Sequence, residues 1–411
     1  MGIGDSNIYF SQESIKDIKS YINYCYHCYR CINVCPLSHL GVFFPQRLIA
    51  DLTFSSMEDG LTNNNIWECL TCGQCSIYCP MTSNSSGVRI PELILELRKK
   101  SRENKKQSEK MLYCETHNNI FPLLTRLMAD NPLNPNKLDF LNGTKLKTAE
   151  TGPIAYFVGC SPLLQDIFYN FDIKYTDSAI TIIALLNEAN FVPVVLNEKC
   201  CGHDILWGLG DIKRFKKLAE YNVKLYRDAG IKIVIISCAE GYRTWKFDYP
   251  KVIDNFDFEV LHFSEFLLRE KILENKRFPK VHKIKVTYHD SCRLGRLSDK
   301  LYDPPRELLR QIPNVELIEM ENIRDNAQCC GVSAFRGCNE FTHFLIQKRI
   351  NEAIETGADY LIVPCSKCQT HFTCYMNEPS INREKGDLRD KIRIIDLASF
   401  IGRMLFIFQM N

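Results

Sequence analysis

The 411-residue sequence has no long hydrophobic run, no surplus of one charge and no apolar leader. No stretch approaches the ~20 apolar residues that span a bilayer, and Arg403 interrupts the most apolar segment, 397–408. The first residues lack the basic start and apolar core of a secretory signal. A formal net charge of +2 argues against a nucleic-acid partner. We therefore expect a cytoplasmic protein, peripheral to the inner face of a membrane only through a partner subunit.

The sequence also lacks a flavin-binding fingerprint and the helices of b-type haem proteins, so any flavin or haem must come from other chains. Cysteine, by contrast, is abundant, with 20 in the chain. In a reducing compartment, cysteines in this number are more often metal ligands or catalytic groups than disulfides. Their spacing decides between these roles.

Two four-cysteine runs near the N-terminus share the spacing C-x2-C-x2-C-x3-C, and proline follows each run. This spacing wraps three thiolates around one [4Fe–4S] cluster, while the fourth cysteine reaches the neighbouring cluster in two-cluster ferredoxins. A pair of zinc ribbons is the alternative, but those sites need two C-x2-C pairs separated by a longer loop. We predict two [4Fe–4S] clusters with exchanged fourth ligands. Their ligands are Cys25, Cys28, Cys31 and Cys79 for one, and Cys69, Cys72, Cys75 and Cys35 for the other.

The sequence around these runs favours helices. Residues 44–54 carry apolar side chains at helical spacing, and a segment that starts at Pro91 has proline at a plausible first helical position. We therefore predict a helical two-cluster ferredoxin module over residues 1–110, followed by a linker over 111–152.

From about residue 153 one pattern occurs twice: strand, helix, strand, Cys-Cys-Gly, helix, strand, cysteine. Strands that alternate with helices predict parallel sheets with helices on their faces, and ligands then lie beyond the carboxyl ends of the strands. The predicted fold class is α plus α/β, with one α/β domain over 153–282 and a second over 283–411. The expected strands are 154–160, 192–197, 231–237, 283–291, 315–320 and 359–364, and the expected helices are 178–190, 210–230, 304–312 and 342–358.

Each repeat is expected to gather its cysteines at one sheet edge. The first repeat offers four thiols, because Gly241 stands where the second repeat has a fifth cysteine. The candidate metal ligands are Cys160, Cys200, Cys201 and Cys238 in the first repeat, and Cys292, Cys329, Cys330, Cys365 and Cys368 in the second.

These motifs resemble the CCG-domain proteins of the heterodisulfide reductase superfamily over roughly residues 20–400. The architecture is similar to that of the D-type heterodisulfide reductase polypeptide, which corresponds to a fusion of the C-type and B-type polypeptides. The iron–sulfur subunit of anaerobic glycerol-3-phosphate dehydrogenase and the related glycolate and lactate oxidase subunits share the layout. The motifs are specific to the superfamily but not to one substrate.

The resemblance implies a non-cubane [4Fe–4S] cluster at the five-cysteine site, where a disulfide-type substrate would be reduced or formed. The four-cysteine site departs from that pattern, so an altered cluster, a structural zinc ion and an empty site all remain open. The implied partners are a flavoprotein or b-type cytochrome membrane subunit and a disulfide or thiol small molecule. The alternative is an electron-transfer subunit without its own substrate, which links an FAD-dependent dehydrogenase to a quinone pool.

Three histidines flank the CCG motifs, namely His203, His289 and His371. Such a histidine could protonate a departing thiolate, although most single histidines are structural. His289 lies three residues before Cys292 and is the strongest catalytic candidate. The remaining cysteines, Cys114, Cys338 and Cys374, fit no motif and are expected to be small buried side chains.

Overall fold

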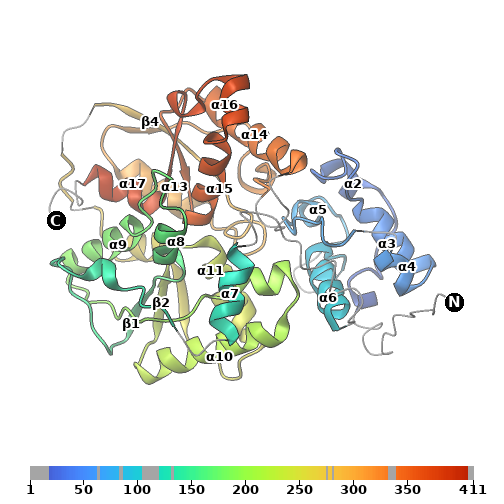
Figure 1. The fold of residues 1–411 in the computed structure, drawn as a ribbon, viewed down its shortest axis with the longest axis horizontal. Coiled ribbons are helices and arrows are strands. Elements are labelled where there is room, and N and C mark those ends of the chain that lie inside the picture. The colour runs from blue at the N-terminus through green and yellow to red at the C-terminus, as the bar shows by residue number, and fades with distance from the viewer. Residues whose placement is uncertain are drawn as a thin grey trace. The chain divides into compact units, whose positions relative to one another are not determined.

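The computed structural model in Figure 1 describes residues 18–62, 65–82, 87–103, 120–130, 134–274, 276–279, 282–331 and 339–405. The chain divides into two compact units. The first comprises residues 1–125, 204–213 and 331–345, and the second comprises 126–203, 214–330 and 346–411. Both ferredoxin-type cysteine runs belong to the first unit, and all nine candidate cysteines of the repeats belong to the second.

The described part of the first unit consists of short helices joined by loops that carry cysteines. Pro45 starts α3, where its missing N–H leaves no intrahelical bond unmade. Leu48, Ile49 and Leu52 form the buried face of α3, which confirms the predicted helix. The helices are α2 (Arg30–Val34), α3 (Pro45–Phe54), α4 (Met57–Thr62), α5 (Gln74–Ile77), α6 (Ile90–Glu103) and the π-helix η4 (Asp204–Gly208).

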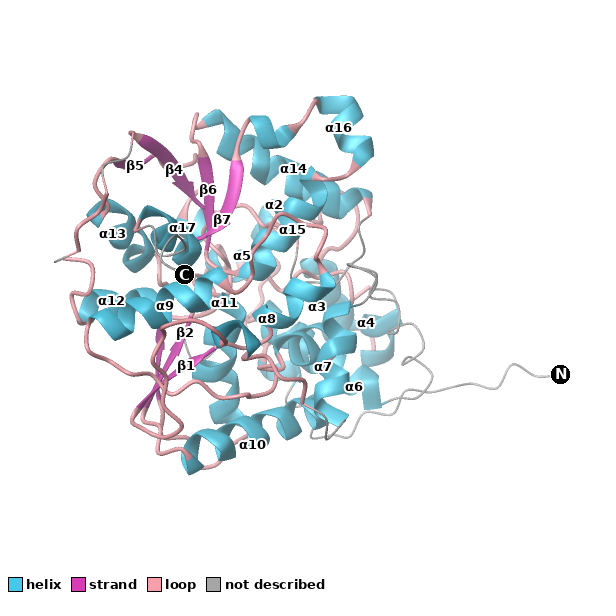
Figure 2. Ribbon diagram, turned by 60° about the vertical axis from the view of Figure 1, so that its left-hand side comes forward, coloured by secondary structure: helices cyan, strands magenta, loops and turns pink. Residues whose placement is uncertain are grey.

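The second unit contains two parallel sheets, one from each repeat (Figure 2), which confirms the predicted α/β class. In the first sheet Ala155, Val234 and Val260 stand in register across the strands. Its strands are β1 (Ile154–Phe157), β2 (Ile233–Ile236) and β3 (Glu259–His262), in that order. The second sheet has the order β5-β4-β6-β7, with β4 (Ile284–Tyr288), β5 (Val315–Leu317), β6 (Tyr360–Val363) and β7 (Arg393–Asp396).

One predicted strand, at 192–197, is wrong in extent, because it is reduced to a bridge at Val194. The Val194 N–H donates to Ile154 O at 2.8 Å, and Val194 O accepts from Tyr156 N–H at 3.0 Å. Pro193 has no N–H to extend this ladder. Val194 thus pairs with β1 as β5 pairs with β4, so both repeats have the same strand order.

Helices α9, α12, α13 and α17 lie between the two sheets (Figure 2), and α9 packs directly against α17. Their side chains share one hydrophobic core with both sheets, for example Ile182 of α9, Leu308 of α13 and Phe400 of α17. The two repeats are therefore joined through a common core. The helices of the repeats are α8 (Ser161–Ile167), α9 (Asp177–Glu188), α10 (Ile212–Asp228), α11 (Ala239–Arg243), α12 (Phe263–Arg269), α13 (Asp303–Gln311), α14 (Glu340–Glu355), α15 (Ser366–Met376), α16 (Pro379–Lys385) and α17 (Leu397–Met404).

The segment expected to be a linker contains α7 (Ile120–Asp130) and a short 3-10 helix, Asp139–Leu141. Leu138 and Phe140 pack against the core of the second unit. The domain boundaries at 110, 152 and 282 stay predictions. Among the described residues, no helix has the length and apolar character needed to cross a membrane.

Candidate iron–sulfur sites

The first ferredoxin-type run lies close to the last cysteine of the second run. Burial, followed by the charges of Cys25, Cys79 and Cys28, raises the pKa of Cys31 to about 12. Cys79 therefore lies near the first cysteine run, and the crossed ligand assignment stays a prediction. Left-handed backbone at His27 (φ 58°) and Tyr29 (φ 64°) bends the loop between these cysteines.

The second group of four thiols lines a single cavity in the first unit, together with Leu37 and Phe43. Burial raises the pKa of Cys75, and the neighbouring thiols of this group add to that effect. Apolar walls and four converging sulfurs fit a buried cluster. The four cysteines are Cys35, Cys69, Cys72 and Cys75.

Arg98 of α6 is fully buried and supports this second group. Its guanidinium donates to Ile66 O at 2.9 Å, to Cys69 O at 2.8 Å and to Trp207 O at 2.6 Å. Burial raises the pKa of Cys69 to about 12, and the positive charge of Arg98 opposes that rise. Arg98 thus fixes the backbone of the cysteine loop and places a cation beside the site.

The spacing of the sulfurs distinguishes a cluster from a single ion. Zinc holds thiolates at about 2.3 Å, which puts them about 3.8 Å from one another in a tetrahedral site. Among the eight ferredoxin-type cysteines, all of them described, no three sulfurs lie within 4.8 Å of one another. A four-iron cluster binds each thiolate through a separate iron and accepts this wider spacing. The two four-thiol sets are compatible with [4Fe–4S] clusters.

The glycine of each CCG motif has a conformational role. Gly202 (φ +86°) and Gly331 (φ +78°) both adopt the left-handed backbone that side chains disfavour. A Cβ atom at Gly202 would also come within 3.0 Å of the Phe215 ring. Glycine therefore closes the turn that carries the two adjacent thiols.

The second CCG site forms where β4, β6 and the CCG turn meet. Cys365 caps α15 and accepts from Cys368 N–H at 3.4 Å, and the two sulfurs lie 3.2 Å apart. One ring nitrogen of His289 and the sulfurs of Cys330 and Cys368 all lie within 4.8 Å of one another. Cys329 is buried beside Cys330 in the chain, and Cys292 is partly buried in the turn after β4.

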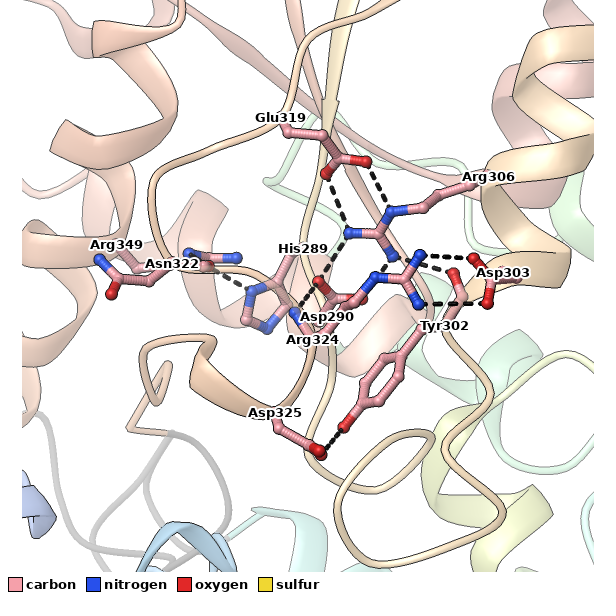
Figure 3. A network of polar contacts seen from close by, with 10 residues as sticks. All are labelled: His289, Asp290, Tyr302, Asp303, Arg306, Glu319, Asn322, Arg324, Asp325 and Arg349. Atoms are coloured by element: carbon pink, nitrogen blue, oxygen red, sulfur yellow. Dashed lines mark hydrogen bonds and ion pairs between the residues drawn. The ribbon is translucent and has the colours of Figure 1, made fainter. Parts of the chain in front are cut away.

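His289 is held by the sheet and by a buried arginine (Figure 3). Its backbone N–H donates to Ile362 O of β6 at 2.9 Å, and Arg349 Nε donates to its Nδ1 at 3.0 Å. Phe372 of α15 packs edge-on against the imidazole, with ring centroids 5.4 Å apart. The other ring nitrogen, Nε2, is buried and has no hydrogen-bond partner among the described residues.

The neighbouring Asp290 belongs to a separate ion-pair network, also drawn in Figure 3. Its carboxylate accepts from Arg306 at 2.7 and 2.8 Å and from Arg324 N–H at 2.7 Å. Arg306 also donates twice to Glu319, at 2.7 and 2.9 Å. Asp290 therefore stabilises the segment that follows β4, while Arg349 contacts the ring of His289.

The first CCG site is built on the same plan with different groups. Cys238 caps α11 and accepts from Gly241 N–H at 3.5 Å. A hydrogen bond with Cys200 and burial raise the pKa of Cys201 well above its usual range, and the charges of Cys238 and Cys160 add to the rise. The structure therefore brings these four thiols into one neighbourhood, although no three of their sulfurs lie within 4.8 Å of one another.

His203 of the first site has both ring nitrogens occupied. Arg293 Nε donates to its Nε2 at 3.0 Å, so the proton lies on Nδ1 and is donated to Thr244 Oγ1 at 3.1 Å. Burial and the charge of Arg293 hold the pKa of His203 well below its usual range. His203 is thus a structural histidine, in contrast to His289.

The two CCG sites adjoin within the second unit. Hydrogen bonds from the thiols of Cys238 and Cys368 hold the pKa of Cys365 well below its usual range. Lys367 Nζ forms a buried ion pair with Glu240 at 3.0 Å. The motif Cys238–Gly241 of the first repeat therefore faces Cys365–Cys368 of the second.

Sequence reasoning missed the buried charged residues around these sites. Arg349 lies on the buried face of α14 beside Ile346 and Ile350, and a charged residue within an apolar helix face is the one sequence signal that could have identified it.

His371 and Cys374 lie on α15. His371 is buried and Cys374 is partly buried, and their roles stay predictions. Cys114 and Cys338 lie outside the described residues. No cysteine that the structure describes forms a disulfide bond.

Residues 154–242 and 286–373 match the family of the CCG cysteine-rich domain, and residues 21–83 match the 4Fe-4S dicluster domain. The chain therefore belongs to the CCG-domain iron–sulfur proteins, and it is an iron–sulfur electron-transfer subunit related to heterodisulfide reductase.

The chain is similar in sequence to three characterised types of redox protein. The chain is 28% identical to the D polypeptide of the dihydromethanophenazine:CoB–CoM heterodisulfide reductase of Methanosarcina mazei, over 74% of this chain and 72% of that protein. It is 28% identical to the EtfAB:quinone oxidoreductase of Syntrophomonas wolfei, over 75% of this chain and 42% of that protein. It is 26% identical to the B polypeptide of the fumarate reductase (CoM/CoB) of Methanothermobacter marburgensis, over 89% of this chain and 70% of that protein.

Proposed function

We propose that this subunit passes electrons through two [4Fe–4S] clusters to the second CCG site, which reduces or forms a disulfide-type substrate. One observation carries the proposal: the sulfurs of Cys330 and Cys368 lie within 4.8 Å of a ring nitrogen of the buried His289, and Cys365 Sγ lies 3.2 Å from Cys368 Sγ. A buried N–H beside these sulfurs would stabilise negative charge on a reacting thiolate.

The reaction consumes two electrons and two protons: R–S–S–R′ + 2 e⁻ + 2 H⁺ gives R–SH and R′–SH. Five residues would hold a non-cubane [4Fe–4S] cluster, which when bound supplies iron that takes up a sulfur atom and single electrons. The chain contributes burial, which strengthens every charge interaction at the site, and the His289 N–H, which stabilises negative charge on sulfur. The five residues are Cys292, Cys329, Cys330, Cys365 and Cys368.

Electrons would reach this site through the ferredoxin module. Four-iron clusters gain negative charge on reduction, so the cation of Arg98 beside Cys69 favours the reduced state of the cluster there. The electron donor would be a flavoprotein or b-type cytochrome subunit of the same complex. Such a partner would hold the subunit at the inner face of the membrane.

The first CCG site is the weakest match to a five-thiolate cluster, because Gly241 removes one ligand. We infer an altered iron–sulfur cluster there. Its four thiols share one buried neighbourhood, and four thiolates suit an iron–sulfur cluster.

The four-cysteine first site favours a second candidate function. In this alternative the subunit has no substrate of its own and links an FAD-dependent dehydrogenase to a quinone pool. The similarity to an EtfAB:quinone oxidoreductase supports this alternative.

An anaerobic assay separates the two functions. Reduced methyl viologen would supply electrons, and a panel of small disulfides or a soluble quinone would accept them. Disulfide-dependent dye oxidation that is lost in Cys368→Ser supports the first proposal. Quinone reduction without any disulfide activity would leave the electron-transfer role and reject the disulfide chemistry.

A further inference from the structure

We propose that Arg349 is a positioning residue that keeps the proton of His289 on Nε2. The imidazole then donates a hydrogen bond to sulfur at the second CCG site and cannot become a metal ligand. This inference rests on the proposed function in one respect, because it assumes that the thiols of the second site hold an iron–sulfur cluster.

The hydrogen bond between Arg349 and His289 can run in one direction only. An arginine guanidinium carries donors and no acceptor, and it stays charged in proteins. Arg349 Nε lies 3.0 Å from His289 Nδ1, so Nδ1 must accept. A neutral imidazole has one proton, which therefore lies on Nε2. A second proton on Nδ1 would break this bond and set two buried cations against each other.

Arg349 is itself fixed in place. Its guanidinium donates to Glu352 Oε2 at 2.7 Å and to Asn322 O at 3.0 Å, and the side chain has no exposed surface. The edge-on ring of Phe372 and the backbone bond to Ile362 set the plane and the position of His289. Neither side chain can turn away without breaking several buried contacts (Figure 3).

A ring nitrogen of His289 lies within 4.8 Å of the sulfurs of Cys330 and Cys368, and Arg349 already occupies Nδ1, which leaves Nε2. It has no hydrogen-bond partner among the described residues, His289 is 1% exposed, and Cys330 and Cys368 are the neighbouring ligand atoms. A buried unpaired N–H is costly, and a sulfur of the bound cluster would supply the acceptor that it lacks. His289 therefore looks like a third ligand by proximity alone, but its tautomer makes it a donor.

The histidine of the first site shows that this arrangement is specific. There the arginine contacts Nε2 of His203, and the proton on Nδ1 goes to Thr244 Oγ1. Each repeat thus pairs a buried histidine with an arginine, but only the second leaves an N–H for sulfur.

Pulsed electron paramagnetic resonance on the holoprotein with ¹⁵N-labelled histidine tests the tautomer. The wild type should show an exchangeable proton coupled to the second-site cluster and no directly coordinated nitrogen. Arg349→Met frees Nδ1 to carry the proton, so a coordinated nitrogen should appear and the exchangeable proton should be lost. A coordinated nitrogen in the wild type would overturn the proposal without any variant.

Two further variants separate positioning from folding. Arg349→Lys keeps a donor for Nδ1 and should restore the wild-type couplings, whereas Glu352→Gln disturbs Arg349 without removing its Nε–H and should leave them unchanged. Loss of the N–H donor should also lower the reduction potential of the second-site cluster, and disulfide reduction should fall roughly 10- to 100-fold in Arg349→Met. Unchanged couplings and potential in Arg349→Met would reject the inference. Absence of any second-site iron in the wild type would instead reject the proposed function, and the inference with it.

Discussion

The two CCG repeats share strand order, core and cysteine placement, yet they differ in the groups that surround the thiols. In the second repeat Cys368 completes the thiol set, a ring nitrogen of His289 lies within 4.8 Å of two sulfurs, and His289 Nε2 has no partner among the described residues. In the first, Gly241 replaces the fifth thiol, and both nitrogens of His203 are bonded to protein groups. A duplicated fold has therefore kept two cysteine-rich edges with different neighbours. Under the proposed function, this asymmetry would place the disulfide chemistry at the second site and leave support or electron transfer to the first.

The largest effect is expected from removing a thiol of the second site. Cys368→Ser should abolish disulfide reduction and lower the iron content by about four atoms per chain, because Cys368 has three sulfur or nitrogen neighbours in the site. Cys374→Ser, on the same helix but outside every motif, is the matched control and should keep both. Iron analysis and the dye-linked assay check the pair, and equal losses in both variants would contradict the site assignment.

Each repeat also has a buried ion pair whose loss should destabilise the fold. Arg306→Met leaves the buried Asp290 without its partner and should lower the free energy of unfolding by about 3–5 kcal/mol. Lys137→Met, in the segment before the first repeat, leaves the buried Glu198 of that repeat without its partner, but burial already raises the pKa of Glu198, so that group can take up a proton instead. We expect a smaller loss for Lys137→Met in anaerobic urea unfolding. A larger loss in the first repeat than in the second would contradict this order.

A fifth thiol in the first repeat would test whether the number of cysteines distinguishes the two CCG sites. A Cβ at position 241 would lie 3.5 Å from Cys238 Cβ and 3.1 Å from Ile236 Cγ2, so a small adjustment accommodates it. Gly241→Cys should therefore add a second paramagnetic signal of the second-site type. Gly241→Ser introduces the same Cβ without a thiolate and should add none. If the cysteine variant gives no new signal, the missing thiol is not what distinguishes the two sites.

The smallest expected effect is on the pH dependence of stability, and it concerns the first residues of the equivalent helices α9 and α13. Burial raises the pKa of Asp177, at the start of α9, to about 6, whereas the hydrogen bond from Arg324 lowers the pKa of Asp303, at the start of α13. The folded state binds the Asp177 proton more tightly than the unfolded chain does, so stability falls as pH rises from about 4 to about 6 and stays lower above that.

Asp177→Asn should therefore stabilise the protein at pH 7 by about 1–2 kcal/mol, after allowance for partial solvent screening, and should have little effect at pH 4. Asp303→Asn should act in the opposite direction, with a small loss of stability at pH 7 that vanishes in acid. Thermal unfolding at both pH values measures these differences, and the same sign for both variants at pH 7 would contradict the account.

Much of the architecture could be predicted because its signals are local. The predicted helices at 178–190, 210–230 and 342–358 are confirmed as α9, α10 and α14. Apolar residues recur along them, and Gly230 and Gly357 follow the ends of the last two. The CCG spacing also anticipated two cysteine-rich sheet edges. Strands β3 and β7 were missed because each is only four residues long and carries polar side chains at its ends.

The surroundings of the sites could not be predicted, because they join residues far apart in the chain. Arg349 is sixty residues from His289, and Arg293 reaches His203 over ninety. Buried polar partners are selected by three-dimensional geometry and leave no periodic pattern. The tautomer of His289 likewise follows from the identity of its neighbour and not from its own position in the sequence.

The central claim is that the second repeat alone binds a reacting sulfur. Electron paramagnetic resonance tests it most directly, with spectra of the oxidised protein recorded with and without mercaptoethanol. We predict a thiol-dependent signal in the wild type that persists in Cys160→Ser and disappears in Cys330→Ser. A signal that disappears in Cys160→Ser and survives in Cys330→Ser would contradict the account, as would about eight irons per chain with no thiol-dependent signal.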